Sequence, residues 1–285
     1  MCRVWEEAVL LAPEDMLYSF GMSVYGAMAQ MVGHPNSPVI MEPIFAIDMH
    51  VRALPTARLG AMADIMRATH LDQAILASLC RENDMYHVRQ RCAILVSRMA
   101  LTMPPPKFHD MVRATTRWPD LCRSLISTSV MLTHARSRKL VALGLAHILR
   151  HASAEDTGLL SAVPDMIGLW TEVLGEVVED EAGSADRYER EMSPTRALEI
   201  GEDGIPFLDE FGLIETASTP SSARTDAVRK RDPAFTVPLR AYVADTLNTV
   251  LQDGSHKTEL QSLLATIDPL VLDTLQRGLS ERPAA

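Results

Sequence analysis

The stretch LQSLLATIDPLVLDTLQ, residues 260–276, contains the pattern that decides the fold. Its first half repeats apolar side chains at positions i, i+3, i+4 and i+7, the spacing that gathers them on one face of an α-helix. These residues are Leu260, Leu263, Leu264 and Ile267. Asp268-Pro269 then predicts a new helix, because aspartate caps helix N-termini and proline suits the first helical turn. The pair is suited to close the end of a helical stack.

Helical spacing recurs through the rest of the chain. Apolar residues at i, i+4, i+7 and i+8 occupy two further segments, 141–149 and 243–251. No long run alternates with period two, and aromatic residues make up only 5% of the chain, so a sheet protein is not indicated. Prolines fall where helices would begin. We expect helices at 14–33, 39–53, 57–69, 71–82, 85–102, 107–116, 119–132, 135–151, 156–180, 237–252, 257–266 and 269–279.

This succession of short helices predicts an all-α protein. Antiparallel helix pairs stacked with a period of about forty residues would form an α-solenoid of HEAT-like repeats with terminal capping helices. A compact helical bundle gives the same amphipathic pattern, so the pattern alone does not distinguish the two. For the cap we expect seven core contacts from the C-terminal helices. They are Leu239, Val243, Leu247, Leu263, Leu264, Val271 and Leu275.

Composition and charge restrict the function. The net charge of −10 disfavours general nucleic-acid binding and favours either solubility or basic protein partners. The four cysteines are widely scattered, which is typical of reduced core thiols in the cytosol or nucleus. They are Cys2, Cys80, Cys92 and Cys122. The uncharged segment 16–33 is polar enough to favour a buried helix over a membrane span.

From Glu179 to Arg231 the composition shifts toward Ser, Thr, Pro and acidic residues, and such a segment buries too little apolar surface to order itself. We therefore predict helical repeats at 1–180, an acidic, polar and largely flexible insertion at 181–231, and capping helices at 232–280. Glu179, Asp180 and Glu181 begin the acidic stretch and are the candidate weak electrostatic contacts for a basic partner.

Motifs for chemistry are absent or incomplete, so we predict no catalytic, cofactor or metal residue. His147 and His151 lie four apart, but Ile148 stands where a zinc protease needs glutamate, which favours a solvated or interhelical pair. Gly21-Met-Ser23-Val-Tyr-Gly26 is spaced wrongly for a nucleophile elbow and lies in a helical pattern. The short basic cluster 229–231 resembles a nuclear-localisation signal, although a solvated linker end beside Asp232 is favoured.

Two blocks near the C-terminus resemble the importin-11-type karyopherin-β family of nuclear transport receptors. One contains Asp232-Pro233, Thr236-Val237, Leu239, Val243 and Leu247. The other contains Gln261-Ser262-Leu263, Thr266-Ile267-Asp268, Val271 and Leu275-Gln276-Arg277-Gly278-Leu279. A weaker similarity begins at Lys139-Leu140-Val141. The specific resemblance covers about residues 135–280, and the first half supports a generic helical repeat.

The resemblance implies the C-terminal portion of an import receptor, acting in Ran-dependent transport between cytoplasm and nucleus and at the nuclear pore. It implies basic protein cargo and nuclear pore proteins as partners, no nucleic acid, no membrane insertion and no cofactor. Ran would bind only through N-terminal repeats that lie outside this chain. Two other hypotheses stay open: a HEAT-repeat scaffold subunit of an unrelated complex, and an all-α enzyme without a recognisable motif.

Overall fold

The computed structural model describes residues 2–34, 40–81, 85–153, 155–156, 158–176, 224, 227–228, 230–252 and 257–280, and no strand occurs among them. The helices are α1 (Cys2–Leu11), α2 (Pro13–Gly33), α3 (Met41–Ala53), α4 (Thr56–Ala68), α5 (Leu71–Cys80), α6 (Tyr86–Thr102), α7 (Pro105–Thr115), α8 (Trp118–Ser129), α9 (Ala135–Arg150), the 3₁₀ helix η1 (Leu159–Ala162), α10 (Val163–Glu176), α13 (Pro233–Thr236), α14 (Leu239–Gln252), α15 (Lys257–Leu264) and α16 (Pro269–Ser280).

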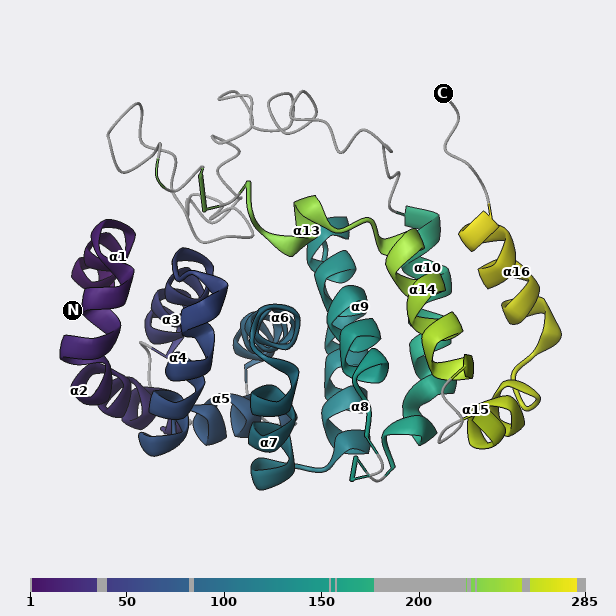
Figure 1. Cartoon of the computed structure of the whole chain (residues 1–285), viewed down its shortest axis with the longest axis horizontal. Helices are drawn as coiled ribbons and strands as arrows, with labels where there is room; N and C mark the ends of the chain where they lie inside the picture. Colours follow the sequence, from purple (N-terminus) through teal and green to yellow (C-terminus); the bar gives the residue numbers. More distant parts are fainter. Residues whose placement is uncertain are drawn as a thin grey trace.

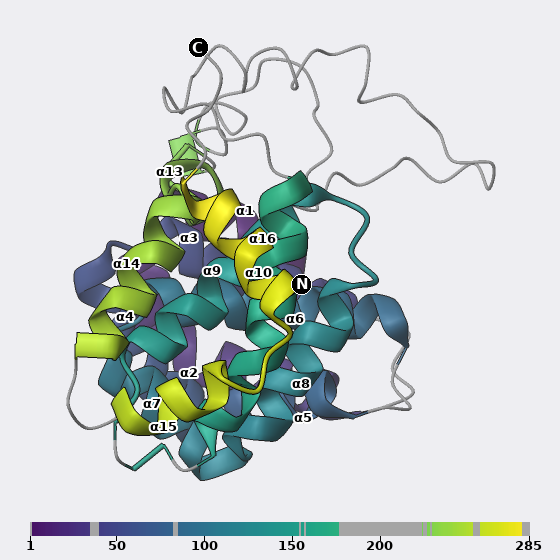
Figure 2. The same cartoon turned by 90° about the vertical axis from the view of Figure 1, so that its right-hand side faces the viewer.

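The helices stack side by side into an α-solenoid (Figure 1). One layer runs α1, α3, α6, α9, α14, each helix packed against the next, and a second layer behind it contains α2, α5, α8 and α10. Figure 2 looks along this stack from its C-terminal end, with α14, α15 and α16 toward the viewer. Each helix touches mainly its neighbours in the stack, which is the arrangement of a repeat protein. The predicted all-α solenoid of helix pairs is confirmed.

The middle helices of the first layer have little or no solvent face. Every residue from Cys92 to Ala100 in α6 is buried, as is every residue from Lys139 to Ala146 in α9. A helix that is covered all round lies in a core rather than at a surface. The two helices approach closely at Gly144, where an added Cβ would lie 2.8 Å from the Cβ of Ser97. The helix α10 also packs on α9, where the indole Nε1 of Trp170 donates a hydrogen bond to the carbonyl of Ala142 at 3.0 Å.

The predicted helix positions agree with the structure to within a few residues, with three exceptions. The helices α1 and α13 were not expected. The expected helix over 156–180 is wrong at its beginning, where an irregular link leads into η1 and then α10. This link contains Gly158 at φ +80°, a left-handed conformation that glycine adopts without strain. Its backbone turns around the buried side chain of Asp156, which explains why no helix forms there.

The C-terminal helices cover the end of the stack. The helix α14 packs on α9, and α16 packs on α10. Leu239, Val243 and Leu275 are buried, and the other four expected cap residues pack against the core while partly exposed. The expected cap contacts are therefore confirmed. The expected insertion at 181–231 lies almost entirely outside the described residues, so the division into three segments stays a prediction.

The remaining structural expectations concern thiols and membranes. Cys92 and Cys122 are buried and Cys80 is partly buried, and all three are free thiols. Burial raises the pKa of the Cys122 thiol to about 12, so this thiol stays protonated. Gly21 and Gly26 lie inside α2, as the helical pattern predicted. Among the described helices, none is long and apolar enough to cross a membrane.

Candidate functional site

The candidate contacts Glu179, Asp180 and Glu181 lie outside the described residues, so their role stays a prediction. Polar side chains that the structure does describe gather in four clusters between helices, three with buried centres and one that is partly exposed. Each cluster is built from residues that lie far apart in the sequence. Their geometry decides whether they form a reactive site or hold the solenoid together.

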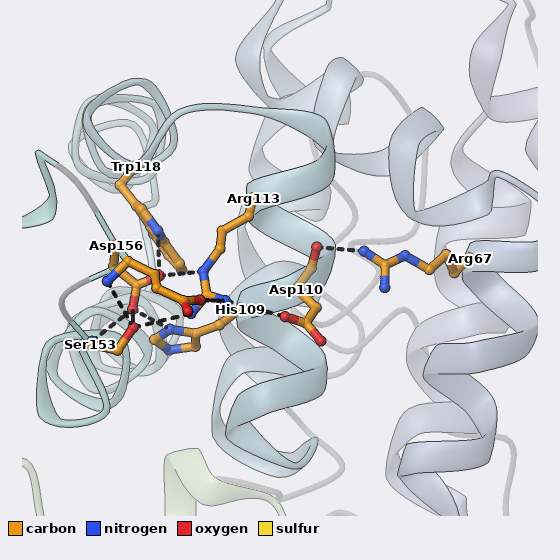
Figure 3. A network of polar contacts seen from close by, with 8 residues as sticks. Arg67, His109, Asp110, Arg113, Trp118, Ser153 and Asp156 are labelled. Carbon is orange, nitrogen blue, oxygen red and sulfur yellow. Dashed lines mark hydrogen bonds and ion pairs between the residues drawn. The ribbon is translucent and has the colours of Figure 1, made fainter.

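The largest cluster surrounds Asp156 (Figure 3). Its Oδ1 accepts hydrogen bonds from Arg113 Nε and Trp118 Nε1, each at 2.9 Å. Its Oδ2 lies 2.9 Å from His109 Nδ1 and accepts from Ser153 N at 2.8 Å and Ser153 Oγ at 3.0 Å. The carboxylate therefore ties the link after α9 to α7 and α8.

Electrostatics agree with this anchoring role. Burial alone would raise the pKa of Asp156, but the hydrogen bonds from Arg113, Ser153 and His109 outweigh it and hold that pKa well below its usual range. Arg113 also pairs with Asp110 and Glu155, and Arg67 donates to the carbonyl of Asp110 (Figure 3). Both carboxylate oxygens of Asp156 are occupied, so the cluster has the chemistry of a structural anchor and not of a general base.

The His147–His151 pair belongs to the contact between α9 and α14. The two rings lie 4.4 Å apart between centroids, and His147 Nδ1 shares a hydrogen bond with the hydroxyl of Tyr242. Burial, aided by the nearby His151, lowers the pKa of His147 to about 4. Arg150 covers the Tyr242 ring and pairs with Asp245 at 2.5 Å. A solvated or an interhelical pair was expected: His147 makes the interhelical contact, and His151 is exposed to solvent. The described residues contain no group of three or more side chains that could hold a metal ion.

A smaller cluster joins α1, α2 and α3. His50 Nδ1 lies 2.7 Å from the hydroxyl of Tyr25, and His50 Nε2 lies 2.9 Å from the carbonyl of Pro13. The carbonyl can only accept, so Nε2 donates and Nδ1 accepts from Tyr25. The Trp5 ring packs edge-on against both rings. Burial lowers the pKa of His50 to about 4, and this imidazole is neutral at pH 7.

The fourth cluster is a closed ring of alternating charges formed by Asp48 and Arg52 of α3, Arg98 of α6, and Asp232. Arg52 Nη2 lies 2.6 Å from Asp48 and Arg52 Nε lies 3.5 Å from Asp232. Arg98 donates to Asp48 and lies 2.8 Å from Asp232 through Nη2. Arg52, Arg98 and Asp232 are at most 2% exposed in their side chains. The ring holds two positive and two negative charges, so it is neutral.

All four clusters consist of groups whose hydrogen bonds cross between helices of the solenoid. The arrangement is typical of a scaffold that presents its outer surface to other proteins. The model of the family described as Importin-11-like, TPR repeats matches residues 1–280. The chain belongs to this family. Comparison with curated proteins and with solved structures gave no significant match.

The importin-11-like match extends the resemblance seen in the sequence. The residues quoted for it covered about 135–280, whereas the family model also covers the first half of the chain. The family description assigns its repeats to the TPR type. TPR and HEAT repeats are both antiparallel helix pairs that stack into solenoids, so the architecture is the same at this level.

Sequence reasoning missed most of the clustered residues. Asp232 had a signal, because Asp232-Pro233 belonged to the resemblance. Nothing in the sequence indicated its ion pairs with Arg52 and Arg98, because Asp232 and Arg98 lie 134 residues apart. The basic residues Lys230 and Arg231 beside Asp232 are exposed, as expected of a linker end.

Proposed function

We propose that this importin-11-like solenoid is a protein-binding segment of a nuclear import receptor in Ran-dependent transport between cytoplasm and nucleus. The observation that carries the proposal is the family match over residues 1–280, together with a continuous stack of helix pairs over the described part of that range. Stacked pairs offer an extended surface for a protein partner. Basic cargo and nuclear pore proteins are the proposed partners, and the proposed locations are cytoplasm, nucleus and the pore.

The acidic stretch at Glu179, Asp180 and Glu181 is proposed to attract basic cargo over a long range. Such attraction weakens as salt rises, because exposed charges are screened beyond about 10 Å at 0.1 M salt. The net charge of −10 supports the choice of a basic partner. We expect the isolated chain to bind GTP-loaded Ran only weakly, since the family's Ran surface lies in N-terminal repeats.

A binding titration tests the proposal. Purified 1–285 is titrated with a basic nuclear-localisation peptide at several salt concentrations, and separately with GTP-loaded and GDP-loaded Ran. A variant carrying E179Q, D180N and E181Q should bind the peptide several-fold more weakly and lose part of the salt dependence. The control E7Q, E42Q and D165N removes the same charge at exposed helical positions and should bind like the wild type.

The outcomes separate the hypotheses. Peptide binding lost only in the first variant supports an acidic cargo contact. Equal losses in both variants would show that only net charge matters and would contradict the assigned site. Sub-micromolar, GTP-selective Ran binding would show that the chain contains a complete Ran surface. If the peptide does not bind, the scaffold hypothesis replaces the transport proposal.

A further inference from the structure

The segment that enters α13 is held on α3 and α6 by buried ion pairs. The helix α13 is only four residues long and packs on α9. Ala234 is its one buried side chain, and Phe235 lies under the guanidinium of Arg136 of α9. The ion pairs of Asp232 with Arg52 and Arg98 join this segment to α3 and α6.

Asp232 divides its two oxygens between two tasks. Its Oδ1 accepts from the backbone N–H of Ala234 at 2.9 Å and so caps α13. Its Oδ2 accepts a hydrogen bond from Arg98 Nε at 2.9 Å. The same oxygen forms ion pairs with Arg52 and Arg98. Without Asp232, Arg98 would lose one of the two carboxylates with which it forms ion pairs, and it would share the carboxylate of Asp48 with Arg52. The Arg98 guanidinium lies in a site that is shielded from water, so this loss of charge compensation is costly.

We propose that Arg52 and Arg98 form a carboxylate-binding site between α3 and α6, and that Asp232 fills it as an internal ligand that straps the C-terminal helices onto the solenoid. The arginines are positioned by Asp48, which contacts both of them. Planar guanidinium groups fixed in this way match the geometry of a carboxylate. The charge around Asp232 is consistent with this: burial would raise the pKa of its carboxyl group, but Arg98 and Arg52 outweigh burial and lower that pKa.

The chain supplies a matched control for the strap. Asp268 also precedes a proline and caps a helix, accepting from Leu270 N at 2.8 Å. Asp268 is exposed and forms no ion pair with any residue that the structure describes. Replacing Asp268 therefore removes a cap alone, whereas replacing Asp232 removes a cap and the internal ligand.

The experiment measures thermal unfolding of full-length D232A, D232N and D268A in formate and in chloride of equal ionic strength at pH 7. In chloride we expect D232A to lower the melting temperature by about 10 °C and D268A by about 3 °C, because loss of a buried ion partner costs several times more than loss of a cap. Formate fits the space that the missing carboxylate of D232A would leave and should raise the melting temperature of this variant in proportion to the logarithm of its concentration. D232N leaves no such space and should not respond.

Hydrogen exchange locates the effect. In chloride, D232A should increase exchange in residues 233–252 and leave α4 and α5 unchanged, and formate should reverse the increase. Should D232A fail to fold in chloride, its refolding yield in formate against chloride replaces the melting temperature. An equal response of D232A and D268A to formate, or equal losses of stability in the two variants, would overturn the proposal.

Discussion

Gly144 lies so close to Ser97 that a Cβ at position 144 would come within 2.9 Å of the Ser97 Cα and within 3.2 Å of its carbonyl oxygen. These two atoms belong to the backbone of α6, so no side-chain rotation can make room. Any larger residue at position 144 must push α6 and α9 apart. Because these helices form the buried middle of the first layer, moving them apart would also displace the helices packed against them.

We therefore expect Gly144→Ala to destabilise the protein, although alanine favours helices. Overpacking a dense core costs about 1–3 kcal/mol, which exceeds the roughly 1 kcal/mol gain in helix propensity. Gly168→Ala in α10 is the control, because an added Cβ there meets nothing within 4 Å. Urea denaturation should show G144A less stable and G168A equal to or more stable than the wild type. A stabilised G144A would contradict the close packing of α6 on α9.

Replacement of Asp156 by asparagine should be costly. The change keeps the shape but removes the charge that Arg113, His109 and Trp118 share, and we expect a loss of about 3 kcal/mol. Glu155→Gln removes one exposed partner of the same Arg113 and should change stability by less than about 0.5 kcal/mol. Chemical denaturation at pH 7 compares the two, and similar small effects would show that the link after α9 has other anchors.

The same carboxylate predicts acid sensitivity. Asp156 has a lowered pKa in the folded protein, so its stabilisation is fully present above the ordinary carboxyl pKa and is lost as pH falls toward the lowered value. The wild type should therefore lose more stability than D156N below about pH 4. Parallel curves of unfolding free energy against pH for the two proteins would be the contrary result.

Two histidines are expected to cause a second loss of stability, at a higher pH than the loss caused by Asp156. Burial lowers the pKa of His50 and of His147 from 6.5 to about 4, so the unfolded chain binds more protons between these values. Stability should fall as pH drops from 6.5 to 4, by roughly 2–3 kcal/mol for each histidine. In H147Q the unfolding free energy should fall less steeply over this pH range, because the contribution of His147 is missing. The same slope in H147Q and in the wild type over this range would speak against this contribution.

The cap can be tested on one helix. Leu275 of α16 is 5% exposed and Leu270 of the same helix is 67% exposed. Leu275→Ala should cost about 2–4 kcal/mol and increase binding of a hydrophobic dye, whereas Leu270→Ala should be nearly neutral. Equal behaviour of the two variants would mean that α16 does not cover α10. The approach of Gly278 to Leu174, with an added Cβ at 3.6 Å, argues for that cover.

Local sequence signals predicted most of the helices because each signal acts within a few residues. Prolines and apolar spacing located α7, α9 and α14 to within two residues. The helix α1 was missed, although Trp5 and Val9 are buried four positions apart. The link before η1 was missed because Asp156 acts there through partners on α7 and α8, which no local pattern contains.

Local sequence signals could not predict contacts between distant segments. Asp232 belonged to the resemblance, but its contacts with Arg52 and Arg98 could not be predicted, since a charged residue on a helix is usually solvated. Only the stacking of α3 beside α6 makes those two arginines neighbours. The histidine pair was a partial success: its interhelical position was expected, but its partner Tyr242, 95 residues away from His147, was not.

The burial of Trp5 in α1, Trp118 in α8 and Trp170 in α10 gives the chain three built-in fluorescent reporters at separate positions along the stack. Each indole is shielded from water in the folded state, so its emission should shift to longer wavelength when its own section opens. Variants that retain a single tryptophan could follow the sections one at a time. Coincident shifts would indicate one cooperative unit, and staggered shifts would show which end of the solenoid opens first.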